Sequence, residues 1–431
     1  MLTLSRAYFR RAFNHDVRSS LPAAIQAIMQ NGLLVRAFED ALVPQFLYPR
    51  AATQRPWSGN LGDTATFTRA GLLTPVTTAL TVGNDPTAAT YSIEQYSATM
   101  NQYGNAVDTN LLQSAMTLAS KFVEDNQILA INAGQSLNRI SRTKLYNAYT
   151  GGRTWATATS SSSTTLQVNS TQGFGTVLVN GVPTAVSAGN PLNVTVNGVA
   201  NTVTGVTDAT HLVLGSAISA SVGWAVVAAN APVSYRPTGS TRYDLSGSNT
   251  ATMALFRSAV ARLRSMNVPT VAGNYVAHID PTTEAQLFAD SDFKQAYQGR
   301  GDSAVFAEMS LGVFQGIDWV RNNEAPTTTD GGSSANLTVH QPLVLGADAL
   351  LAAPFANMGS LLSEVEGPHG SIQLIGPADG VQVAHIVRPP QDRLQQVVSS
   401  AWSYVGDFTV PSDATTGDAA LYKRAVLIEH C

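Results

Sequence analysis

The stretch that decides the fold is residues 107–150, VDTNLLQSAMTLASKFVEDNQILAINAGQSLNRISRTKLYNAYT. Apolar or small residues recur along it at helical spacing, which predicts one long helix with a single apolar face. These residues are Leu111, Ala115, Leu118, Phe122, Leu129, Ala133, Leu137, Ile140 and Ala148. Asp108 suits an N-cap, and Gly151 followed by Gly152 suits the end. At about 1.5 Å per residue the helix would be roughly 60 Å long, so we expect a strut of an extended molecule; two shorter helices broken near Gly134 are the alternative.

Composition excludes some classes of function. The 431 residues suffice for two or three domains, and the net charge of −4 gives no overall attraction to nucleic acid or acidic membranes. Charged residues make up 13% of the chain, about half the usual share. A surface covered by partners would explain this depletion, and so would a composition rich in small residues.

The cysteine count and the N-terminal residues indicate in which cellular compartment the protein folds. Cys431 is the one cysteine, which excludes a disulfide within the chain and a cysteine metal site, and favours an intracellular protein. Residues 1–18 carry four arginines without the apolar core of a signal peptide. No apolar run reaches eighteen residues, so we expect no transmembrane helix and no membrane partner.

The N-terminal hundred residues lack the pattern of a self-contained domain. Residues 1–55 predict an arm, with a helix over 21–39 and an extended, proline-broken segment over 42–49. Residues 56–100 predict a thin two-stranded loop, with strands at 64–68 and 89–100 around a segment rich in Thr, Gly and Pro. Such a hairpin is marginal alone, so we expect it to lie on a partner.

Residues 153–240 form an island of different composition, where Asp208 is the one formally charged residue between positions 154 and 235. Asn180-Gly181 and Asn197-Gly198 each join alternating runs, which is the strongest short signal for a hairpin. We expect a small all-β sandwich or barrel inserted at the end of the long helix.

The remaining chain mixes helices and strands and predicts an α+β domain. A helix is expected over 249–266, a strand over 274–279, and a second helix that begins at Asp280-Pro281. Buried strands are expected over 311–320 and 343–345, a flexible loop over 326–336, and returning strands over 372–388 and 421–430.

Motifs of catalysis are weak in this sequence. His278 lies two residues from Asp280, and the pair suits a strand end beside a helix cap better than a metal or acid/base pair. Arg300-Gly301-Asp302 matches a cell-attachment tripeptide, which we attribute to chance. We therefore predict no enzyme, with no catalytic, cofactor-binding or metal-ligand residues.

The order of arm, two-stranded loop, long helix and α+β domain resembles the tailed-bacteriophage major capsid protein of the Hong Kong 97-type fold, in a podovirus-like branch. Similar segments are 275–281 (YVAHIDP), 312–317 (GVFQGI), 343–349 (LVLGADA) and 392–396 (DRLQQ) followed by 402–404 (WSY). The resemblance covers about 340 residues and leaves out the 153–240 region.

The resemblance implies a division of the chain and a function. The division is 1–55 N-terminal arm, 56–100 extended loop, 101–152 peripheral domain with its spine helix, 153–240 inserted β domain, 241–380 mainly axial domain and 381–431 return strands. The function is a structural subunit that self-assembles into hexamers and pentamers of an icosahedral shell around double-stranded DNA, in virions of the class Caudoviricetes. The expected partners are other copies, a separate scaffolding protein, a portal, a decoration protein and the packaged DNA through non-specific contact, with assembly in the host cytoplasm.

Three alternatives stay open. An encapsulin-type nanocompartment shares the fold and would package a cargo enzyme in place of DNA. A β-rich adhesin or fibre protein rests on residues 153–240 and the Arg-Gly-Asp tripeptide. An enzyme is the third.

Overall fold

A computed structural model describes residues 32–57, 62–110, 118–298, 312–356, 371–411 and 424–431, apart from single residues and pairs within these ranges. The described chain divides into two compact units. The first comprises residues up to 65, 97–142 and 351–409, and the second comprises 66–96, 143–350 and 410–431. None of the helices in the described ranges combines the length and the apolarity that a membrane-spanning segment requires.

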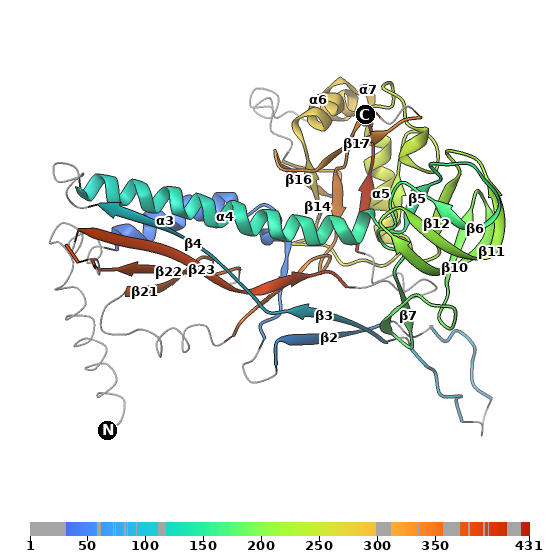
Figure 1. Ribbon diagram of the computed structural model, residues 1–431, viewed down its shortest axis with the longest axis horizontal. Coiled ribbons are helices and arrows are strands. Elements are labelled where there is room, and N and C mark those ends of the chain that lie inside the picture. The colour runs from blue at the N-terminus through green and yellow to red at the C-terminus, as the bar shows by residue number, and fades with distance from the viewer. Residues whose placement is uncertain are drawn as a thin grey trace. The chain divides into compact units, whose positions relative to one another are not determined.

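The first unit is built on a six-stranded sheet (Figure 1). Its strands are β1 (Thr53–Gln54), β4 (Asn101–Asn110), β20 (Leu351–Pro354), β21 (Ser371–Ile375), β22 (Val383–Arg388) and β23 (Val397–Thr409). β23 pairs antiparallel with β20, β22 and β4, and its register with β4 runs from Val397 opposite Asn110 to Gly406 opposite Asn101. β20 and β21 fall within the range expected to be mainly axial, but they belong to this sheet.

The predicted long helix is present as α4 (Leu118–Thr150), whose residues up to 142 belong to the first unit. Its 33 residues correspond to roughly 50 Å at the usual rise. Phe122, Leu129, Ala133 and Leu137 of the predicted stripe are buried. The helix continues through Gly134, where a Cβ would lie 2.5 Å from the Cβ of Gln45. Gly134 therefore allows the arm to approach the helix backbone, and no break forms there.

The predicted helix start was wrong. Val107 and Asp108 lie in β4, opposite Ser400 and Ser399 of β23, and residues 111–117 lie outside the described residues. Asp108 caps no helix, because its side chain accepts a hydrogen bond from Ser399 Oγ. The helical spacing did not produce a helix at Val107 and Asp108, because these residues pair with a strand almost 300 positions further along the chain.

The described part of the arm packs within its own unit. α3 (Leu33–Leu42) continues into two short 3₁₀ turns, Val43–Gln45 and Pro49–Ala51, so the expected extended segment over 42–49 was wrong. Phe38, Leu42 and Tyr48 are fully buried. The Tyr48 amide donates to Asn138 Oδ1 of α4 at 3.0 Å, and the rest of the expected helix over 21–39 precedes the described residues. The described part of the arm therefore lies along its own unit, where it contacts α4 and β22.

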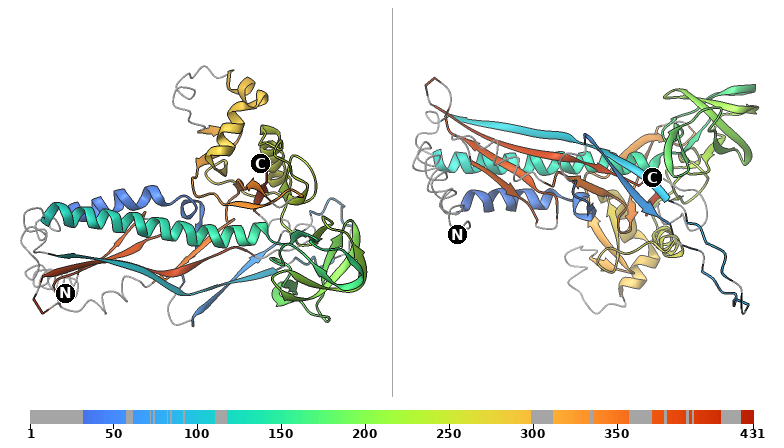
Figure 2. Two further views of the ribbon diagram at one scale, coloured as in Figure 1. Left: turned by 45° about the horizontal axis from the view of Figure 1, so that its top comes forward. Right: turned by 90° about the horizontal axis from the view of Figure 1, so that it is seen from below.

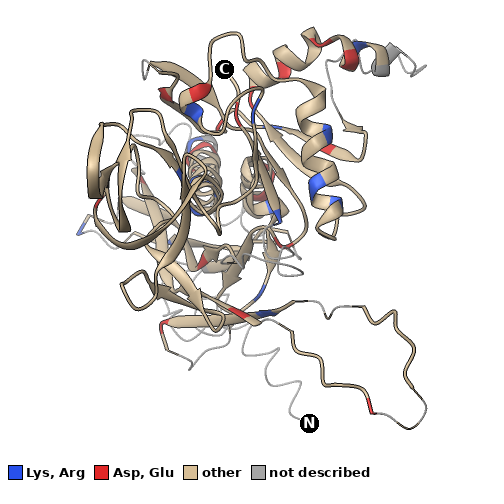
Figure 3. Ribbon diagram, turned by 90° about the vertical axis from the view of Figure 1, so that its right-hand side faces the viewer, with Lys and Arg blue, Asp and Glu red and all other residues tan. Residues whose placement is uncertain are grey.

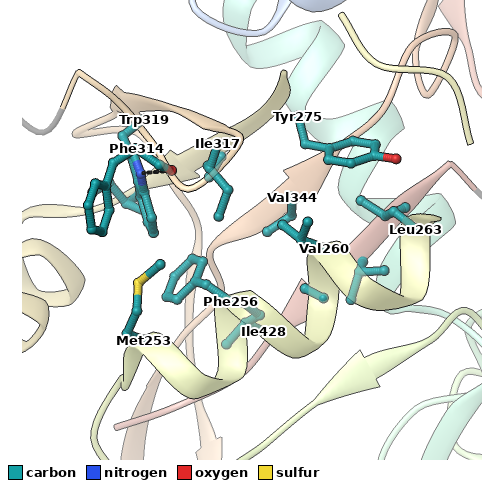
Figure 4. Packing of buried hydrophobic residues seen from close by; sticks show 14 of the residues in the cluster. Met253, Phe256, Val260, Leu263, Tyr275, Phe314, Ile317, Trp319, Val344 and Ile428 are labelled. Carbon is teal, nitrogen blue, oxygen red and sulfur yellow. Dashed lines mark hydrogen bonds between the residues drawn. The ribbon is translucent and has the colours of Figure 1, made fainter. Parts of the chain in front are cut away.

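The second unit contains a mixed six-stranded sheet in the order β13-β24-β19-β14-β16-β15. The strands are β13 (Ser234–Tyr235), β14 (Tyr275–Ile279), β15 (Val313–Phe314), β16 (Ile317–Arg321), β19 (Leu343–Leu345) and β24 (Ala425–Ile428). Helix α5 (Met253–Ser265) packs Phe256, Val260 and Leu263 against Val344 and Ile428 (Figure 4). The expected strand over 311–320 is a hairpin, because Gln315 and Gly316 both take positive φ.

Two further helices and a ribbon complete this sheet region. α6 (Pro281–Ala289) begins as predicted, since the Asp280 side chain accepts from the amides of Thr282 and Thr283. α7 (Ser291–Gln298) follows, and Arg300-Gly301-Asp302 lies outside the described residues. The loop expected over 326–336 holds a strand, because β17 (Thr327–Gly331) pairs with β18 (Leu337–His340).

Residues 153–229 form a β region with its own core, here called the β module. Its sheet has the order β5-β12-β9-β10-β11-β6. The strands are β5 (Arg153–Trp155), β6 (Ser160–Gln167), β9 (Leu192–Val196), β10 (Val199–Asp208), β11 (His211–Ala220) and β12 (Ala225–Ala228). β7 (Thr176–Val179) and β8 (Val182–Ala185) form a separate ribbon. Both predicted Asn-Gly turns are confirmed, with Asn180 at φ 51° and Asn197 at φ 48°.

Candidate assembly surfaces

The candidate surface is part of the loop expected over residues 56–100. It consists of residues 71–92, which connect β2 (Thr64–Ala70) to β3 (Ile93–Thr99) and are called the extended loop from here on. Every described residue from Leu73 to Ile93 is exposed. Val76 is 82% exposed, Leu80 61% and Leu73 52%. Figure 2 shows the segment as an open loop beyond the β2–β3 ribbon. Apolar side chains grouped on an exposed segment are typical of a protein interaction site.

Charge is nearly absent from this loop. Asp85 is its one formally charged residue (Figure 3). Burying the loop against another protein would therefore desolvate little charge, and each apolar Å² removed from water contributes about 25 cal/mol. The two strands expected within residues 56–100 are present as β2 and β3, and contact of the loop with a partner stays a prediction.

The loop is fixed at its root. Arg69, which is 7% exposed, donates to the Asp348 carbonyl at 3.2 Å and lies 5.9 Å from the ring centroid of Tyr96. Arg424 pairs with the carboxylate of the same Asp348 at 2.8 Å. These contacts hold both strands of the ribbon near the body, while the described loop residues stay exposed. Local sequence patterns did not predict the contact of Arg69 with Asp348, because the two residues are 279 positions apart along the chain.

A second feature is a cluster of four charged residues, Arg236, Arg242, Asp330 and Glu429, which we call the anchor cluster. The side chains of Arg236 and Glu429 are buried, and those of Arg242 and Asp330 are partly exposed. The Glu429 carboxylate is 3% exposed and pairs with Arg236, while Arg242 Nε lies 3.5 Å from Glu429 Oε1. Arg242 also lies 3.4 Å from Asp330. Buried charges are tolerated when they are paired and hydrogen-bonded.

The β module contacts the anchor cluster directly. Arg242 lies over the ring of Trp155 at 5.8 Å, and Asn169 donates to Asp330 at 2.8 Å. Arg153 donates to the Ser240 carbonyl at 3.2 Å. Burial, together with the positive charge of Arg236, lowers the pKa of Arg153 to about 10 against the opposing effect of Glu429. The cluster therefore ties the β module to the segment that follows it.

The pair singled out in the sequence, His278 and Asp280, is divided between two environments. His278 is fully buried in β14, an inner strand of the sheet, and Asp280 caps α6. The partners of Asp280 are His340 at 2.7 Å and Thr283. Thr283 contacts His430 at 2.7 Å. Sequence reasoning missed His340 and His430, which lie far from Asp280 along the chain and are joined to each other by a β-bridge.

This polar cluster suits structure better than catalysis. Thr283 and His430 are both fully buried, so a substrate could not reach the hydroxyl. Burial raises the pKa of Asp280, but hydrogen bonds from His340 and Thr283 and the charges of both histidines outweigh it and hold the pKa near 2. Among the described residues, no group of three His, Cys, Asp or Glu side chains could hold a metal ion.

The buried histidines predict a loss of stability in acid. Burial lowers the pKa of His278 to about 3 and of His430 to about 4, from 6.5. Between pH 6.5 and about 4 the unfolded chain binds protons that the folded chain does not, so the free energy of unfolding falls as pH falls. Asp280 adds a second loss below pH 3.8, as the pH approaches about 2. Urea unfolding followed by circular dichroism at pH 7, 5.5 and 4.5 measures this slope.

Replacing one histidine provides the control for that experiment. His278→Asn keeps a polar side chain and removes one titrating group, so its unfolding free energy should depend less steeply on pH over this window. An equal slope in wild type and variant would contradict the assignment.

The chain was compared with family models, curated proteins and solved structures. No family model and no curated protein matches the chain. Solved structures that it resembles include the capsid of Ralstonia phage GP4, with 14% identity, TM-score 0.48 and coverage of 88% of this chain and 87% of that one. The capsid of cyanophage Pam1 gives 13% identity, TM-score 0.48 and 92% coverage of both chains. The mature capsid of bacteriophage PhiM1 gives 8% identity, TM-score 0.45 and coverage of 89% and 86%.

Proposed function

We propose that the chain is the major capsid protein of a tailed bacteriophage, a structural subunit without enzymatic activity. In this proposal it has the Hong Kong 97-type fold, and the β module is an inserted domain. The observation that carries the proposal is the extended loop, whose described residues are exposed from Leu73 to Ile93 while its root is fixed by Arg69. A loop built in this way is complete only when another copy covers it.

The rest of the architecture supports the same function. Residues 118–142 of α4 and the 13-residue strand β23, joined by the hydrogen bond from Trp402 to Asn132, give the first unit the stiff elements that a shell wall requires. A net charge of −4 suits a container for DNA, since a strongly basic wall would bind the phosphate backbone tightly and hinder its movement. Heterologous contacts between copies close into rings when the rotation closes.

The proposal includes an assembly route and partners. Copies would form hexamers and pentamers of an icosahedral shell around double-stranded DNA, assembled in the host cytoplasm. A separate scaffolding protein, a portal and a decoration protein would take part. The encapsulin alternative uses the same kind of shell around a cargo enzyme, and the β module together with the N-terminal arm favours the capsid.

Electron microscopy tests the proposal directly. The full chain is expressed alone and together with the genes next to its own, and the particles are sedimented and imaged in negative stain. Closed shells or rings of five and six subunits are expected. A 45.4 kDa monomer that stays monomeric under both conditions would contradict the proposal, and shells that enclose only a cargo enzyme would favour the encapsulin.

A further inference from the structure

The tip of the β7–β8 ribbon contacts the return strand of the extended loop. The Gln95 amide of β3 donates to the Gly181 carbonyl at 2.8 Å. A Cβ on Gly181 would lie 1.7 Å from the Ile93 carbonyl oxygen, which is far inside contact distance. Figure 1 shows β7 beside the end of β3 at which the loop returns. The ribbon therefore approaches β3 as closely as it does because position 181 has no side chain.

The contact lies where it can restrict the direction of the loop. β2 and β3 form a two-stranded sheet, and such a ribbon has marginal stability and two open edges. Ile93 is the first residue of β3, so the ribbon tip meets β3 where the chain returns from the exposed loop. A contact at this point constrains the direction in which the loop leaves the ribbon.

We infer that the β7–β8 ribbon is a positioning element for the extended loop, so that the β module of a chain sets the direction of the loop of the same chain. Gly181 and the Gln95 amide are the groups that make the contact. The consequence for assembly rests on the proposed function, while the contact itself can be measured on the unassembled chain.

The chain provides a matched pair of glycines for the test. Gly181 and Gly198 both follow an asparagine in a two-residue hairpin turn, and both have φ of 81°. Alanine is strained to a similar degree at the two positions. Nothing lies within 4 Å of a Cβ at Gly198, whereas at Gly181 the methyl group would collide with Ile93. Any difference between Gly181→Ala and Gly198→Ala therefore reports on the contact with β3.

The first measurement is hydrogen exchange of the full chain at a concentration below assembly. Loss of one backbone hydrogen bond, with a net value of about 1 kcal/mol, corresponds to roughly fivefold faster exchange. Peptides that cover residues 93–100 should exchange about five times faster in Gly181→Ala than in Gly198→Ala. Chymotrypsin should cut the loop faster in Gly181→Ala as well. Equal exchange and equal cleavage in the two variants would overturn the inference.

The second measurement is the yield of closed particles. Gly181→Ala should give several-fold fewer closed shells than Gly198→Ala, with more open or irregular assemblies. Faster exchange with an unchanged shell yield would overturn the positioning role. If the wild type forms no shells, the proposed function fails, and the exchange measurement still decides whether the ribbon holds the loop.

Discussion

Shells are expected to disappear when the tip of the extended loop carries two negative charges, while the chain itself stays folded. The change is Val76→Asp with Leu80→Asp. Both side chains are largely exposed, at 82% and 61%, and surface substitutions of this kind change the free energy of unfolding by about 0.5 kcal/mol or less. In a shell the same positions would be covered by another copy, where a buried and unpaired carboxylate costs several kcal/mol. Because every subunit repeats the defect, shell yield should fall more than about 100-fold, since each 1.4 kcal/mol is a factor of ten.

Sedimentation measures the yield of shells, and thermal unfolding of the same preparations measures whether the chain stays folded. Val222→Asp is the control, because Val222 is an exposed apolar residue (46%) in a turn of the β module. Its shells should form normally. The conservative double variant Val76→Ile with Leu80→Met should also assemble. Normal shells from the doubly charged variant would show that the loop tip is not an assembly contact.

The second large effect is expected at the centre of the anchor cluster. Glu429→Ala leaves Arg236, which is buried, and Arg242 without their shared carboxylate. Removing one partner from a buried ion pair typically costs about 3–5 kcal/mol, because the remaining charge is uncompensated. The free energy of unfolding should fall by about that amount. Urea unfolding at pH 7 measures it, and faster hydrogen exchange in β5 would locate the damage at the β module.

A more exposed ion pair provides the comparison. Glu284 pairs with Arg321, whose side chain is 48% exposed, and such pairs contribute about 0–1 kcal/mol. Glu284→Ala should therefore cost much less than Glu429→Ala. Equal losses from the two substitutions would show that the anchor cluster contributes no more than a surface pair.

Local chemistry explains which parts of the fold the sequence could predict. Both Asn-Gly turns formed, because a two-residue turn needs positive φ, which asparagine and glycine accept. The helix start at Asp280 and Pro281 formed because the side chain satisfies nearby amides. The exposed loop was predictable from its lack of any core-forming pattern.

Elements decided by distant partners were not predictable. β4 is polar along most of its length and lies in the sheet because it pairs with β23 over ten positions. The segment from Leu42 to Tyr48 looked extended, yet it forms a short 3₁₀ turn that buries Leu42, Phe46 and Tyr48. One weak sign of the anchor cluster was present in the sequence. Arg236 is the first charged residue after the nearly uncharged stretch of the β module.

The nearly uncharged loop also determines how solution conditions would act on the contacts between copies. Dissolved ions screen interactions between exposed charges beyond about 10 Å at 0.1 M. Asp85 is the one charge in the loop, so screening by salt should have little effect on its contacts. Contacts made by its leucine and valine side chains gain strength in sulfate and weaken on cooling. A particle closed by such contacts would stay assembled in concentrated salt and would dissociate more readily on cooling.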